Sequence, residues 1–346
     1  MNAVILAGGV RSGREVSGSG LPRALWPFPD KPLISLVLAF LRNSGCRRIA
    51  VCANGKTRMI ASQLSSGATP WLDLRYSEDL LPRGPAGCLR DLHDWIGEET
   101  FVAIQGTAHY DFDLNAMLDE HRRTGAAITV GARRCSDDPE LLEPVGVYLV
   151  EPRTLSLIQP VGFQDFKEQF LPKVLAAGML VRCHTIRGSA TLIHSPSHYL
   201  SAIGDAIQRA ANPLPSGYMQ RSPGVIVHES ARIHPTARVS GPAWIDANVT
   251  IEEHAVVLGP TALAESSTVK GHALVHRAVL MESATAGVAA EVLSTVVAPN
   301  TVIRAAPAGN FEAFAPIDPP SRGFAAPLWD RMDRFFALFG TPRSSS

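Results

Sequence analysis

Short apolar runs alternate with amphipathic stretches over the first part of the chain. Strands are predicted by the apolar runs at Ala3–Leu6, Arg48–Ala53, Phe101–Ile104, Ala127–Gly131 and Val145–Val150. Helices are predicted by apolar residues three and four apart within Leu33–Ser44, Leu114–Thr124 and Phe163–Ala177. This alternation is typical of a parallel sheet with crossover helices. We therefore expect a doubly wound, Rossmann-like α/β domain over residues 1–212.

The hydrophobic period changes after a segment rich in Pro and Gly, residues 213–224, which we interpret as a linker. From there on, aliphatic residues stand six places apart, and a small or β-branched residue follows four places after each of the first nine. The aliphatic series is Val227, Ile233, Val239, Ile245, Ile251, Val257, Leu263, Val269, Val275 and Met281. Such spacing is typical of a hexapeptide-repeat parallel β-helix, in which each aliphatic side chain points inward and stacks on the next coil. We expect this β-helix over residues 225–304.

The remaining residues, 305–346, form a tail rich in Pro and Ala that ends in an amphipathic stretch. Its apolar residues lie at helical spacing: Leu328, Met332, Phe335, Phe336 and Phe339. We expect a C-terminal amphipathic helix. It either docks on the protein's own surface, covering the open last coil, or serves as a docking helix for a partner or an interfacial anchor.

Composition narrows the function classes. A chain of 346 residues is longer than a single hydrophobic core usually spans, which favours two domains. The 32 Lys and Arg residues balance the 32 Asp and Glu residues. A balanced charge gives no general attraction to nucleic acid or to an anionic membrane. No apolar stretch approaches a membrane span, and none of the five cysteines forms a C-x-x-C pair. We expect a cytoplasmic protein with reduced thiols.

Several motifs along the chain resemble those of one enzyme family. They are "LAGG" at Leu6–Gly9, "KPLI" at Lys31–Ile34, "SEDLLPRGPAG" at Ser77–Gly87, "VGVYLVEP" at Val145–Pro152 and "SPSHYLSA" at Ser195–Ala202. Their order and spacing resemble those of the sugar-1-phosphate nucleotidyltransferases, or NDP-sugar pyrophosphorylases. The GDP-mannose and ADP-glucose pyrophosphorylases in this family carry a C-terminal hexapeptide β-helix. The resemblance implies a GT-A-like nucleotidyltransferase domain and a left-handed β-helix.

The resemblance also implies a reaction and its residues. In the family, a sugar-1-phosphate oxygen attacks the α-phosphorus of an NTP and pyrophosphate leaves. The implied nucleotide-binding residues are Leu6, Ala7, Gly8, Gly9, Pro82, Gly84, Ala86, Gly87, Gly106 and Thr107. Arg23 stands at the position of the family's loop lysine, so a planar guanidinium replaces a compact ammonium group there. Arg11 or Arg14 could supply the positive charge of the arginine in the family's glycine-rich loop.

Three parts of the family's catalytic machinery are missing from this chain. The two Asp positions that hold Mg²⁺ in the family fall on Thr107 and Leu192, neither of which offers a charged oxygen. The "E-K-P" strand with its sugar-phosphate lysine has no counterpart, since only ten residues separate Gly131 from Leu142. We therefore expect a family member that has lost magnesium-dependent catalysis and has no certain cofactor. It would bind a nucleotide or nucleotide-sugar as a regulatory or scaffold subunit of sugar-nucleotide or polysaccharide biosynthesis. Its partners would be further copies of itself, an active paralogue or a polysaccharide-assembly enzyme.

Two alternatives remain open. The chain could be an active transferase that uses Mg²⁺ on relocated ligands, Asp111 and Asp113, although Asp113 also suits the N-cap of the following helix. Alternatively, the β-helix could transfer acyl groups with one of its histidines as base, the candidates being His228, His234, His254, His272 and His276.

Overall fold

The computed structural model describes residues 1–8, 21–53, 57–66, 72–78, 83–134, 141–193, 195–209 and 214–303. Their contacts divide the chain into two compact units. Of the described residues, 1–8 and 37–191 belong to the first unit, whereas 21–36 and 192–303 belong to the second. Gly9, Arg11, Arg14, Pro82 and the expected tail helix lie outside the described residues.

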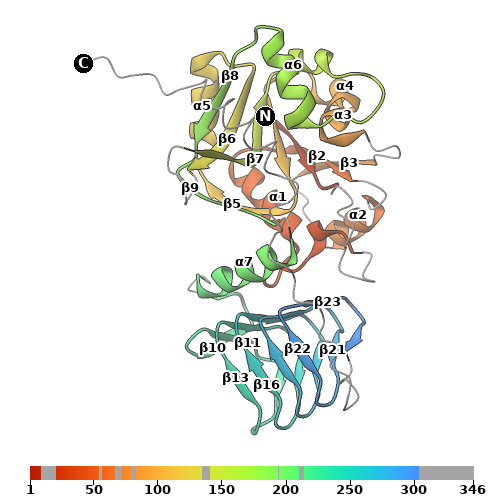
Figure 1. Ribbon diagram of the computed structural model, residues 1–346, viewed down its shortest axis with the longest axis vertical. Coiled ribbons are helices and arrows are strands. Elements are labelled where there is room, and N and C mark those ends of the chain that lie inside the picture. Colours follow the sequence, from red (N-terminus) through yellow and green to blue (C-terminus); the bar gives the residue numbers. More distant parts are fainter. Residues whose placement is uncertain are drawn as a thin grey trace, which may run out of the picture. The chain divides into compact units, whose positions relative to one another are not determined.

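The first unit is built on a twisted sheet (Figure 1). Its strands are β1 (Asn2–Leu6), β2 (Arg48–Ala53), β3 (Asp73–Glu78), β4 (Phe101–Gln105), β6 (Ile128–Arg134), β7 (Leu142–Val150) and β8 (Val181–Thr185). They follow the order β3-β2-β1-β4-β7-β6-β8. A separate pair, β5 (Ala108–Phe112) and β9 (Gly188–Leu192), forms a two-stranded ribbon.

The sheet is mixed, which corrects the expectation of a wholly parallel one. Strands β1, β2, β3 and β4 are parallel, but β7 runs antiparallel to both β4 and β6. The reason is the short connection from β6 to β7, because two parallel strands need a crossover of a dozen residues or more. The mixed α/β, Rossmann-like character of the domain is confirmed.

The helices and turns are η1 (Arg23–Leu25), α1 (Leu33–Asn43), α2 (Thr57–Ser66), α3 (Gly84–Asp91), α4 (His93–Ile96), α5 (Leu114–Thr124), η2 (Pro152–Leu157), η3 (Phe166–Phe170), α6 (Leu171–Ala176) and α7 (Pro196–Gln208). The bounds of α5 agree with the sequence prediction. The single helix expected over Phe163–Ala177 is instead a π-helical turn followed by α6. Asp165 sets this late start, since its Oδ1 accepts from the N–H of Lys167 at 2.7 Å and caps the turn.

The C-terminal part consists of short strands stacked in coils (Figure 1). They are β10 (Tyr218–Ser222), β11 (Val225–His228), β12 (Arg232–Ile233), β13 (Arg238–Ser240), β14 (Ala243–Ile245), β15 (Thr250–Ile251), β16 (Val256–Leu258), β17 (Thr261–Leu263), β18 (Thr268–Val269), β19 (Leu274–His276), β20 (Val279–Leu280), β21 (Thr285–Ala286), β22 (Glu291–Leu293), β23 (Val296–Val297) and β24 (Val302–Ile303). Three sheets run along the stack, and within them every pairing except β10 with β11 is parallel. Parallel sheets in this arrangement are consistent with the expected β-helix.

The predicted aliphatic stack lies inside the coils. Val227 pairs with Ile245 and Ile245 pairs with Leu263, and all three are buried. The expected place of Met281 is wrong, however, because Leu263 pairs with Leu280. The turn after Val275 is one residue shorter than in the earlier coils, so the stack slips by one place. Met281 is nonetheless buried. It belongs to a second apolar cluster, separate from the cluster that the stacked aliphatic residues form.

That cluster joins α7 and the segment before α1 to the outer face of the coils. Its largest members are Trp26, Phe28, Tyr199 and Trp244. The rings of Trp26 and Tyr199 lie 4.9 Å apart, and the Tyr199 hydroxyl donates to the Pro27 carbonyl. Residues 192–209, which the sequence analysis assigned to the α/β domain, thus group by contacts with the coils.

The segment interpreted as a linker contains strand β10. Tyr218 and Met219 of this strand pair antiparallel with His228 and Val227 of β11. The Pro- and Gly-rich composition thus marks a turn into the first coil. Among the described residues, no helix is long and apolar enough to cross a membrane.

Candidate functional site

The order of the strands defines one special position in the first unit. From β1 the chain proceeds through β2 to β3 on one side, and then returns to place β4 on the other side of β1. Ligands of open α/β sheets bind outside the carboxyl ends of the strands at such a switch point. Leu6 ends β1 here and is followed by Ala7 and Gly8, while Gly106 and Thr107 follow the end of β4 beside them.

The two strand ends are held together by main-chain hydrogen bonds. The N–H of Ala7 donates to the Cys52 carbonyl at 2.8 Å, and the N–H of Gly106 donates to the Leu6 carbonyl at 3.0 Å. A Cβ on Gly106 would lie 2.9 Å from the Ile5 Cγ2. Any larger residue at this position would therefore have to displace the Ile5 side chain of β1.

Helix α3 begins near the same edge, since only residues 79–83 separate it from the carboxyl end of β3. Gly84 has a φ of +74°, and a Cβ there would lie 2.6 Å from the Gln164 carbonyl oxygen. That carbonyl accepts from the N–H of Ala86 at 3.1 Å, while the N–H of Gln164 donates to the Arg83 carbonyl at 2.7 Å. The predicted nucleotide-binding residues Gly84, Ala86 and Gly87 thus lie in the first turn of α3, which is hydrogen-bonded to the loop before η3.

Arg23 lies in η1, in the second unit, and is half-buried. It is therefore described apart from the residues of the first unit. The first unit brings together Leu6, Ala7, Gly8, Gly106 and Thr107 at one sheet edge, with the α3 turn following β3 at the same edge.

The positions tied to metal binding carry no cluster of acids. Thr107 is half-buried two residues after β4, and Leu192 is half-buried at the end of β9. Asp113 caps α5, its Oδ1 accepting from the N–H of Asn115 at 2.9 Å and of Ala116 at 3.1 Å, so the N-cap interpretation is confirmed. Asp111 is exposed on β5. Within the described ranges, no three His, Cys, Asp or Glu side chains are grouped so that they could hold a metal ion.

The sequence analysis missed three residues that contact one another next to this edge, where β4 pairs with β7: Gln105, Tyr110 and Gly146. Gly146 has a φ of +74°, and a Cβ there would lie 3.0 Å from the Gln105 Oε1. The Tyr110 hydroxyl donates to the Gln105 carbonyl at 3.3 Å and to the Gly146 carbonyl at 3.4 Å. Burial raises the pKa of Tyr110 well above its ordinary value, so the hydroxyl remains a donor. A glycine inside the apolar run "VGVYLV" was the available signal.

The first part of the chain is similar to known proteins. Residues 2–140 match the family described as nucleotidyl transferase. UTP–glucose-1-phosphate uridylyltransferase of Synechocystis is 23% identical over 337 residues, covering 86% of this chain and 87% of that protein. D-glycero-alpha-D-manno-heptose 1-phosphate guanylyltransferase of Aneurinibacillus thermoaerophilus is 25% identical over 133 residues, covering 38% of this chain and 57% of that protein.

A solved structure shares the fold. HddC from Yersinia pseudotuberculosis, crystallised with GMP-PN, matches with a TM-score of 0.50 and 17% identity, covering 59% of this chain and 98% of that one. Residues 2–140 thus match the nucleotidyl transferase family, and relatives that match the chain along most of its length are named as sugar-1-phosphate nucleotidyltransferases.

Proposed function

We propose that this chain binds a nucleotide or nucleotide-sugar at the carboxyl edge of β1 and β4 and does not transfer a nucleotidyl group with Mg²⁺. The observation that carries the proposal is Thr107, which follows Gly106 at the position of the family's magnesium-binding Asp. Mg²⁺ is usually held through carboxylates, and a threonine hydroxyl has no charge to offer. Charge stabilisation is usually the largest part of catalysis, so its loss removes most of the rate.

The second family position supports the same conclusion. Leu192 presents a hydrocarbon side chain, which cannot ligate a metal ion. The possible substitutes are engaged or solvated, since Asp113 spends one carboxylate oxygen on two main-chain N–H groups and Asp111 is exposed. What remains is an edge where the exposed Gly8 follows β1 and Gly106 follows β4, and a small-residue edge of this kind suits phosphate groups.

Such a protein would serve sugar-nucleotide or polysaccharide biosynthesis as a regulatory or scaffold subunit. It would assemble as a homo-oligomer or with an active paralogue, and its coils would form the left-handed β-helix implied by the resemblance. The nucleotidyltransferase-like residues 1–212 would hold the ligand, and residues 225–304 would mediate assembly.

Pyrophosphate release tests the loss of activity. The purified chain is incubated with Mg²⁺, each of the four common NTPs and a panel of sugar 1-phosphates. We expect no turnover above the blank. Turnover that persists through purification and disappears in Arg23→Ala would overturn the proposal.

A second candidate is an active transferase with relocated metal ligands. The relatives that cover most of the chain carry the names of transferases, which favours it. It predicts that Asp111→Ala abolishes turnover, so an Asp111→Ala variant with full turnover would exclude Asp111 as the ligand.

A further inference from the structure

A second polar site lies at the opposite edge of the same sheet. Strand β4 begins directly after Thr100, β7 ends directly before Glu151, and His121 lies in the last turn of α5. Since β4 has five residues, this edge is about 16 Å from the glycine-lined one. An open surface pocket of about 290 Å³ lies here, lined by His121, Arg122, Gly125, Ala126, Glu151 and Arg153.

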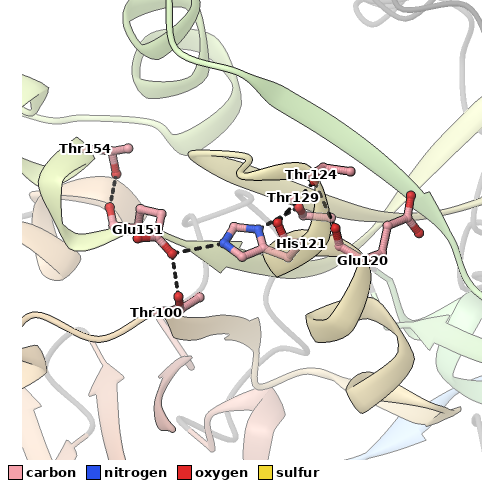
Figure 2. A network of polar contacts seen from close by, with 7 residues as sticks. All are labelled: Thr100, Glu120, His121, Thr124, Thr129, Glu151 and Thr154. Carbon is pink, nitrogen blue, oxygen red and sulfur yellow. Dashed lines mark hydrogen bonds and ion pairs between the residues drawn. The ribbon is translucent and has the colours of Figure 1, made fainter.

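A network of polar contacts includes two of the residues that line the pocket, His121 and Glu151 (Figure 2). His121 is 2% exposed, and its two ring nitrogens lie 2.7 Å from the Thr129 Oγ1 and 3.1 Å from the Glu151 Oε1. The Thr100 hydroxyl donates to the same Glu151 oxygen. The main chain of Glu151 is also tied down, because its N–H donates to the Ala127 carbonyl at 2.9 Å and its carbonyl accepts from the Thr154 hydroxyl at 2.7 Å.

Helix α5 does not need this polar network in order to pack on the sheet. The helix already buries Leu114, Met117 and Leu118, and it is capped by Asp113 at its start and Gly125 at its end. A buried polar group gains little stability over an apolar one of similar volume. The network does hold a carboxylate in one orientation at the cavity, which is the preorganisation that a binding site needs.

Two arginines also line the pocket. Arg122 and Arg153 are both exposed, and within the described ranges neither forms an ion pair. A guanidinium binds a phosphate through two parallel hydrogen bonds. The pocket therefore offers two guanidinium groups and one hydrogen-bonded carboxylate, and its volume of about 290 Å³ lies just below the roughly 300–1,000 Å³ of small-molecule sites.

We propose that this cavity binds a small phosphomonoester that carries hydroxyl groups. Arg122 and Arg153 hold its phosphate, and a ligand hydroxyl donates to the Glu151 carboxylate that His121 and Thr100 keep in place. Because the site lies at the other edge of the sheet, it is separate from the nucleotide edge and does not depend on the function proposed there.

Calorimetric titration of the full chain tests the site, with glycerol 3-phosphate, inorganic phosphate and glycerol as probes. We expect saturable binding of glycerol 3-phosphate, at least about tenfold weaker binding in Arg122→Ala and in Arg153→Ala, and no change in Arg123→Ala. Arg123 is the matched control, because it is an exposed arginine next in α5 that does not line the cavity. All three changes lie on the surface and leave the core intact.

The preference for glycerol 3-phosphate over inorganic phosphate distinguishes a specific binding site from non-specific attraction of anions. Wild-type protein should prefer glycerol 3-phosphate to inorganic phosphate, and Glu151→Gln should lose that preference while still binding phosphate. A saturating nucleotide should leave the affinity for glycerol 3-phosphate unchanged. The proposal is overturned by the absence of saturable binding at millimolar probe, by equal affinity in wild type and Arg122→Ala, or by no preference over inorganic phosphate.

Discussion

Gly106 and Ala7 approach so closely that a Cβ on Gly106 would lie 3.2 Å from the Cβ of Ala7. The contact joins the ends of β4 and β1, where the main-chain bond from Gly106 to Leu6 also lies. The candidate nucleotide edge is thus a place of dense packing between two strands, and its geometry depends on the absence of one side chain.

Gly106→Ala is expected to lower the free energy of unfolding by about 1–3 kcal/mol, since the added methyl group must displace Ile5 or Ala7. Urea unfolding of the two proteins measures the difference. Gly131→Ala in β6 is the matched control, because its Cβ would meet nothing nearer than 3.3 Å. Equal losses in the two variants would show that the contact at Gly106 has no special cost.

Asp113→Ala is expected to destabilise α5 by about 0.5–2 kcal/mol, because two N–H groups at the start of the helix lose their acceptor. Asp113→Asn should restore most of this stability, since Asn is an equally good N-cap. Thermal unfolding of both variants gives the comparison. A capping role leaves nucleotide affinity the same in the two proteins, whereas a large loss of affinity in Asp113→Asn would instead indicate a metal-ligating carboxylate.

Asp30 is expected to make the second unit less stable as the pH rises. Burial raises the pKa of its carboxyl, the charge of Lys31 opposes this, and the charge of Asp246 adds to it. The folded chain therefore holds this proton to higher pH than the unfolded chain, and stability falls as the pH increases from the unfolded value of 3.8 through the raised pKa.

Asp30→Asn removes that dependence. The variant should gain thermal stability relative to wild type at neutral pH, and the gain should shrink as the pH is lowered through the raised pKa. Asp119→Asn, on the exposed face of α5, is the control. A gain for Asp30→Asn that stays constant between pH 4 and pH 7 would argue against a buried carboxylate.

The sequence predicted the elements whose signals are local. The apolar run at Arg48–Ala53 and the capped helix at Leu114–Thr124 have the bounds of β2 and α5, because burial and caps act within each element. The direction of β7 and the pairing of β10 were missed, since both depend on a partner strand. The slip after Val275 was also missed, because the turn there is one residue shorter and a fixed six-residue count assumes that every turn has the same length.

The site was predicted in part for the same reason. The glycines and Thr107 were found through local motifs, whereas Gly146 and Gln105 meet only across paired strands. His121 and Glu151 stand 30 residues apart and look like ordinary residues of a helix end and a loop. No local pattern shows that the fold brings them to one cavity.

The effect of Mg²⁺ on nucleotide affinity tests the central claim most directly. Calorimetric titrations of the chain with UTP, GTP and their NDP-sugars are compared in Mg²⁺ and in EDTA. We predict saturable binding of at least one of these ligands with an affinity that is the same within about twofold in both conditions. An affinity that Mg²⁺ raises by about tenfold or more, together with pyrophosphate release from an added sugar 1-phosphate, would contradict the account.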